Sequence, residues 1–186
     1  MNLFPRSEEL IESIAREFPS FAIRKKSSSS LQRSIDIALR VVTFGQMRTY
    51  LSHYHTVLFG TLWVPDAWER MADLDRYVLL RHERIHLRQR ARMGDFVMGV
   101  VYLFPFFPIG LAYGRARIEW EAYIETIRAT AEVYGMDRAR SLREPILSRF
   151  IGPDYGWMWP FPRTLNTWFD RALATVETEL FSEANR

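Results

Sequence analysis

The chain has 186 residues, 48% of them hydrophobic, which suffices for a single globular domain spanning 1–186 with one sizeable core. It contains no cysteine, so disulfides, thiolate metal sites and a cysteine nucleophile are excluded. The net charge is only +3, and the arginines are scattered among the acids. No nucleic-acid partner is expected, because such partners favour a concentrated basic face. The first residues lack the pattern of a secretory signal, and we expect a cytoplasmic protein.

Two amphipathic helices are predicted in the first quarter of the chain. Ser7 is the expected N-cap of the first, because acids follow it at the positive end of the helix and apolar residues then recur as far as Phe18. Residues 25–30 are rich in lysine and serine and predict a polar loop. The second helix begins at Leu31, and Gly45 is expected to end it.

A short β-hairpin is predicted next. Aromatic and β-branched residues dominate residues 49–64 around the central Gly60. Pro65 then ends the strand and begins helical structure. This helical structure continues to about residue 92, with a break near Asp73 or Asp75.

The second half of the chain predicts mainly helix. One long helix is expected from about residue 115 to residue 134, with Gly135 ending it. A loop rich in glycine, proline and tryptophan covers residues 151–162, and a last amphipathic helix covers about residues 165–181.

One long segment carries no charge. It runs from Phe96 to Tyr113 and meets the lower length limit of a membrane span. Pro105 and Pro108 lie near its centre and would break a helix. We therefore predict a buried helix and loop, and a membrane-embedded or membrane-surface segment is the alternative.

The motif His82-Glu83-Arg84-Ile85-His86 lies within the predicted helix that ends near residue 92. On a helix, His82 and His86 project from one face, one turn apart, so both imidazoles can bind one tetrahedral zinc ion. Glu83 lies beside them, where its carboxylate can take a proton from a water activated by the metal and deliver it to a leaving amine.

The alternative for this motif is three polar residues on a solvated helix face. The helical phase favours the metal site, because apolar residues share the stripe of the two histidines. The predicted inward stripe comprises Leu74, Val78, Leu79, His82, Ile85, His86 and Gln89, whereas Arg81, Arg84 and Arg88 point away from it.

A third metal ligand is expected from another element, leaving the fourth position open for water and substrate. Glu119 is the candidate, because it shares a helical face with small and apolar residues that suit close packing. Glu121 and Glu125 instead lie at helical spacings from Arg117 and Arg128 that suggest surface ion pairs. The alternative for Glu119 is an ion pair with Arg115, four residues earlier.

Together these residues resemble the gluzincin metallopeptidases, and most closely the minimal single-domain members. The run from His82 to His86 matches the first motif of that family, and Glu119-Trp120-Glu121-Ala122-Tyr123 resembles the second. The resemblance covers residues 49–135. It implies an α+β fold, mainly α, with a zincin-like core made of an active-site helix, a glutamate-bearing helix and a short β-hairpin edge.

The resemblance also implies roles for individual residues. His82, His86 and Glu119 would be the Zn2+ ligands, and Glu83 would be the general base and acid. The strand Thr61–Val64 would be the edge with which an extended peptide pairs. Several gluzincin groups have an aspartate where this chain has Tyr123, whose hydroxyl could accept a hydrogen bond from an imidazole.

Four further residues have weaker claims. Tyr155, in a glycine-flanked loop, is the leading candidate for the donor that stabilises the oxyanion, although aromatic packing over a core is the commoner use of such a loop. His53 and His55 alternate along a strand, so only one faces inward. We predict hairpin-surface histidines, with an extra ligand or oxyanion donor as the alternative. Gln89 could orient a ligand or complete the packing.

The motif predicts a zinc-dependent peptidase that hydrolyses amide bonds in a peptide or protein substrate. The alternative is a non-catalytic, zinc-stabilised binding or assembly domain with a peptidase-like fold. Glu83 favours the peptidase, because a structural zinc site has no use for an acid beside its ligands. A membrane-associated protease, resting on residues 96–113, ranks third.

Overall fold

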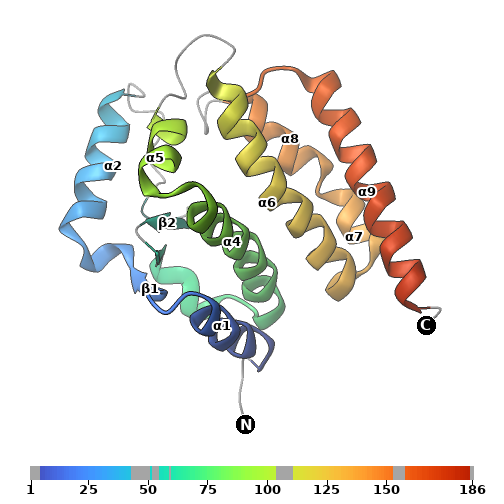
Figure 1. The fold of residues 1–186 in the computed structure, drawn as a ribbon, viewed down its shortest axis with the longest axis horizontal. Coiled ribbons are helices and arrows are strands. Elements are labelled where there is room, and N and C mark those ends of the chain that lie inside the picture. The colour runs from blue at the N-terminus through green and yellow to red at the C-terminus, as the bar shows by residue number, and fades with distance from the viewer. Residues whose placement is uncertain are drawn as a thin grey trace. The chain divides into compact units, whose positions relative to one another are not determined.

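The computed structural model describes residues 5–42, 51, 55–58, 60–103, 111–152 and 158–184. They form mainly α-helices with one small sheet, so the predicted α+β, mainly α, class is confirmed (Figure 1). The chain divides into two compact units, Met1–Leu87 and Arg88–Arg186. Helix α4 (Asp73–Met93) contributes to both.

The first unit contains two helices before α4 and a three-stranded sheet. Its elements are α1 (Pro5–Glu17), β1 (Ala22–Lys25), η1 (Lys26–Ser28), α2 (Ser30–Val42), β2 (Thr56–Leu58), β3 (Thr61–Val64) and η2 (Asp66–Arg70). The break predicted near Asp73 lies between η2 and α4, so that prediction is confirmed. Gly45, the predicted end of the second helix, lies outside the described residues.

The sheet has the order β1-β3-β2. β2 and β3 form the predicted antiparallel hairpin, in which Thr56 is opposite Trp63, and Gly60 turns between them at a φ of 76°. β1 pairs in parallel with the other side of β3, with Ala22 opposite Thr61. β3 is therefore the middle strand. The prediction that Thr61–Val64 is an open edge for a peptide is wrong, because partners take up its backbone groups on both sides.

The predicted polar loop over residues 25–30 is wrong, because the end of β1, η1 and the start of α2 occupy most of it. Lys25 ends β1, and Lys26 begins η1 with no exposed surface. The Lys26 Nζ donates a hydrogen bond to Thr56 Oγ1 at 2.9 Å. A strand was not expected here because lysines and serines rarely mark one, and the pairing with β3 supplies the stabilisation instead.

Helix α1 begins at Pro5, so the prediction of Ser7 as N-cap is wrong. Ser7 lies in the first turn of α1. Pro5 can begin the helix because proline is well tolerated at the first helical position. The Asp73 carboxylate accepts hydrogen bonds from the backbone N–H groups of Arg6 and Ser7, at 3.2 and 2.9 Å. A side chain distant in sequence therefore satisfies the start of α1.

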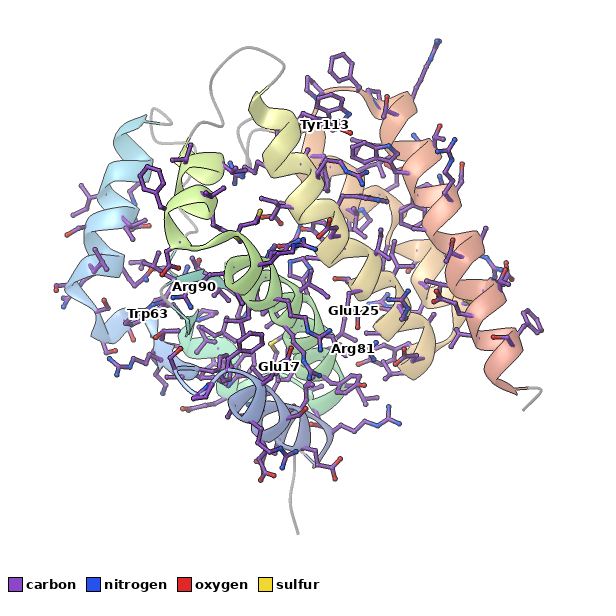
Figure 2. All side chains as sticks on the ribbon, viewed as in Figure 1. Glu17, Trp63, Arg81, Arg90, Tyr113 and Glu125 are labelled. Atoms are coloured by element: carbon purple, nitrogen blue, oxygen red, sulfur yellow. The ribbon has the colours of Figure 1, made fainter. Side chains whose placement is uncertain are left out.

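The core of the first unit lies between α1, the sheet and α4. Leu80 and Leu87 of α4 are buried in it together with residues of the other elements. These others are Leu10, Ile14, Leu62, Val64 and Trp68. The predicted inward stripe of α4 omitted Leu80 and Leu87, which are the most buried apolar residues of that helix. Arg84 also binds across to α1, donating from Nε to Glu17 Oε2 at 2.6 Å (Glu17 is labelled in Figure 2).

The second unit is helical. After the last turns of α4 come α5 (Asp95–Leu103), α6 (Leu111–Tyr134), α7 (Met136–Ser141), α8 (Arg143–Ile151) and α9 (Pro162–Ala184). Figure 1 shows α6 to α9 packed side by side, around a core that includes Trp120, Ile127, Phe150 and Phe169. Gly135 ends α6 at a φ of 86°, as predicted, but α7 and α8 are not among the predicted helices.

The first part of the uncharged segment lies in helix α5. Helix α5 exposes Phe96, Val97 and Val100, so the prediction of burial is wrong for these residues. Residues 104–110 lie outside the described part of the chain. Among the helices that the structure describes, none combines the length and the apolar character needed to cross a bilayer.

Candidate metal centre

His82 and His86 converge on one face of α4. Their Nε2 atoms lie 3.2 Å apart, and their ring centroids lie 4.9 Å apart. Two nitrogens bound at about 2.05 Å to a tetrahedral zinc ion would be roughly 3.3 Å apart. The spacing of the two imidazole nitrogens therefore fits a shared metal ion.

Glu83 is buried, with 6% of its surface exposed, and His86 is 7% exposed. Glu83 is three residues after Leu80 and four before Leu87, so it lies on the face of α4 that packs into the first unit's core. The alternative of a fully solvated polar face is therefore wrong for Glu83 and His86. A buried carboxylate in this position requires compensation from nearby charge or hydrogen bonds.

Lys26 provides positive charge to this region. Burial lowers the pKa of Lys26 to about 8, while the negative charges of Glu83 and Asp36 act to raise it. Asp36 is itself buried and pairs through Oδ2 with Arg40, at 2.8 Å. The interior of the first unit therefore holds a lysine facing two carboxylates, one of which is the predicted general base.

Glu119 lies on α6 in the second unit and is 5% exposed. Its neighbours along the helix are tied to the last turns of α4. The Gln89 side-chain amide donates to the Ile118 carbonyl oxygen at 2.9 Å and to Glu121 Oε2 at 2.8 Å. Gln89 is 2% exposed, so its side-chain amide is buried within the second unit. Gln89 thus holds the backbone and a side chain on both sides of Glu119.

The three predicted ligands are chemically suited to one metal ion. His82 and His86 each offer an imidazole nitrogen, and Glu119 offers a carboxylate oxygen, a set that could hold a metal ion. Two imidazoles and a carboxylate suit zinc, and they also accept other divalent transition metals.

The other two glutamates of this segment make ion pairs. Glu125 pairs with Arg128 at 2.7 Å, as predicted, and Arg128 also reaches Glu179 (Glu125 is labelled in Figure 2). Glu121 pairs with Arg92 at 3.5 Å rather than with Arg117. Arg117 instead places its guanidinium over the Trp168 ring, 5.2 Å from the centroid.

Tyr123 is buried in the second unit, and its hydroxyl oxygen accepts a hydrogen bond from Arg149 Nη1 at 3.0 Å. The sequence suggested an imidazole as a donor to this hydroxyl. Arg149 comes from α8, which the periodicity of the sequence did not identify as an element, so no local signal pointed to it.

The remaining candidates are only partly described. His55 is half-buried, and its ring packs edge-on against Trp68 with centroids 5.8 Å apart. His53 and Tyr155 lie outside the described residues. Lys26 is the residue that sequence reasoning missed, because nothing local distinguishes it from the exposed Lys25.

The comparisons with known proteins identify no relative. No family model matches the sequence, and neither a curated protein nor a solved structure matches it.

Proposed function

We propose that the chain is a zinc-dependent peptidase of gluzincin type, with a zincin-like core, that hydrolyses amide bonds in peptide or protein substrates. One observation carries the proposal. The Nε2 atoms of His82 and His86 converge to 3.2 Å on α4, and the buried Glu83 lies between them in the sequence. The convergence supports two imidazole ligands for one metal ion, and the carboxylate supports a general base beside them.

Glu119 is the third ligand in this proposal. α4 continues without a break from His86 to Gln89, three residues later and on the same helical face. Gln89 then binds the carbonyl oxygen of Ile118, the residue immediately before Glu119. The hydrogen bond from Gln89 to the residue before Glu119 supports the choice of Glu119 over the more exposed Glu121.

A bound zinc ion supplies Lewis acidity, which lowers the pKa of water to about 7 and polarises a carbonyl group. Glu83 accepts the proton of the attacking water and returns it to the leaving amine. Its burial restricts the carboxylate to few orientations, and the positive charge of Lys26 faces it. We also place this activity in the cytoplasm, in line with the absence of cysteine.

One observation favours the second candidate, a non-catalytic zinc-stabilised binding or assembly domain. β3 pairs with β1 on one side and β2 on the other, so it offers no free edge to an extended peptide. A peptidase of this chain would have to bind substrate at β1, at β2 or without strand pairing.

Metal content measured by plasma emission tests the ligand set. We expect about one zinc per purified chain in the wild type and much less in Glu119→Ala, because a site of this type needs at least three protein ligands. Glu132→Ala is the matched control, since Glu132 is an exposed glutamate on the same helix. A wild type that retains no zinc after exposure to the metal would contradict the proposal.

Glu83→Gln then separates the two candidate functions. The variant keeps the shape of the side chain but cannot accept a proton, so it should retain zinc and lose hydrolysis of a peptide library. Zinc binding by the wild type without cleavage of any peptide would favour the non-catalytic domain.

A further inference from the structure

Helix α5 presents an apolar face with no covering among the described residues. Phe96 is 83% exposed, Val97 is 47% exposed and Val100 is 38% exposed. Phe96 and Val100 are four residues apart, and Val100 lies between Phe96 and Val97 on the helical wheel, so the three form one continuous patch. Single exposed apolar residues are ordinary on a protein surface, but three on one face of a short helix mark an interaction site.

Helix α5 is anchored within the second unit by contacts beside the patch and at its N-terminal end. Val101 approaches α6 so closely that a Cβ placed at Gly114 would lie 3.5 Å from its Cγ1. Arg90 binds the Asp95 carboxylate with both Nε and Nη2, and the second contact measures 2.9 Å. Gly94 turns the chain between α4 and α5 at a φ of 81°. These contacts fix the position of α5 within the second unit, and with it the position of the exposed patch.

Positive charge precedes the patch. From Arg88 to Asp95 the chain carries three arginines and a single acid, and Asp95 is neutralised by Arg90. Arg88 and Arg92 are exposed and four residues apart, so they project from one face of the last turns of α4. The side chain of Arg92 is 68% exposed and lies 3.5 Å from Glu121, a distance typical of a weak surface pair.

We propose that α5 docks on the surface of an anionic lipid bilayer, with Phe96, Val97 and Val100 inserted among the acyl chains and Arg88 and Arg92 at the headgroups. A nine-residue helix is about 14 Å long, too short to cross a hydrocarbon core of about 30 Å, so it lies along the interface. Apolar burial and attraction to anionic lipids add together in such helices. The docking does not depend on the proposed peptidase activity.

Co-sedimentation of the full chain with lipid vesicles tests this surface. We expect binding to vesicles of phosphatidylcholine mixed with phosphatidylglycerol, weaker binding to phosphatidylcholine alone, and loss of the difference at about 1 M salt. Phe96→Ser should weaken binding to the anionic vesicles about tenfold. Arg88→Gln combined with Arg92→Gln should weaken it about tenfold as well, and only for anionic vesicles.

Phe181→Ser is the matched control, because Phe181 is a 66% exposed phenylalanine on α9 and should leave vesicle binding unchanged. Equal effects of Phe96→Ser and Phe181→Ser would overturn the assignment of the patch. No sedimentation of the wild type with anionic vesicles would overturn the membrane surface as the partner. A dimer in light scattering that Phe96→Ser dissociates, without vesicle binding, would assign the patch to a second copy instead.

Discussion

Lys26 is the residue whose chemistry departs most from its usual behaviour in proteins. It has no exposed surface, it donates to Thr56, and it faces the carboxylates of Glu83 and Asp36. Lysine is rarely buried unless it is paired, because removing an ammonium group from water is costly. The carboxylates offset only part of this cost, since burial still lowers the pKa of Lys26 to about 8.

This shift predicts a pH dependence of stability. Between pH 8 and the ordinary lysine pKa of 10.5, the unfolded chain binds the proton and the folded chain does not. The free energy of unfolding should therefore rise with pH across this window, by about 3 kcal/mol. Lys26→Met has a similar length and no charge, so it should lack this rise. Urea unfolding of both proteins at several pH values measures the difference, and parallel pH curves would contradict the burial of a titrating lysine.

At the scale of an element, helix α1 depends on a residue outside itself. The Asp73 carboxylate accepts from Arg6 and Ser7 at the start of α1, while Asp73 is also the first residue of α4. Burial acts to raise the pKa of Asp73, but the hydrogen bonds from Ser7 and Arg6 lower this pKa below its usual value. One carboxylate therefore stabilises the beginnings of two helices.

Asp73→Ala should lower the free energy of unfolding by about 1 kcal/mol near neutral pH, the usual cost of a lost helix cap. Because the folded pKa of Asp73 is lowered, its contribution is present above pH 3.8 and is lost as the pH falls below that value. The effect of the substitution should shrink accordingly in acid. Asp75→Ala is the matched control, since Asp75 also lies in the first turn of α4 but is exposed. An equal loss in both variants would show that the helix dipole alone is responsible.

At the scale of the whole molecule, the three proposed ligands come from two helices that are far apart in the sequence, His82 and His86 from α4 and Glu119 from α6. A metal ion held by all three would stabilise the folded chain, because the unfolded chain does not bring the ligands together.

Zinc removal should therefore change the unfolding of the entire chain. At a zinc concentration about 1,000 times the dissociation constant, binding should stabilise the folded chain by about 4 kcal/mol. Calorimetry with zinc and with a chelator measures this as a shift of the transition midpoint. Glu119→Ala should show the chelator curve under both conditions. A zinc-dependent shift of the same size in Glu119→Ala as in the wild type would mean that Glu119 is not a ligand.

Several features follow from local sequence patterns. The turn at Gly60 and the helix end at Gly135 are predictable because both require a positive φ that glycine adopts at little cost. The placement of His82 and His86 on one face follows from the period of a helix. The candidate motif can therefore be recognised from the sequence alone, because it is confined to about one turn of α4.

Only the tertiary structure decides features that join distant residues. The parallel pairing of β1 with β3, the burial of Lys26 and the capping of α1 by Asp73 each unite positions that are far apart in the chain. None of the three has a local signature, because its energy comes from packing and hydrogen bonds that exist only after the elements meet. The exposure of Phe96 has the same origin: an uncharged sequence predicts burial, whereas the way α5 packs determines which of its faces is covered.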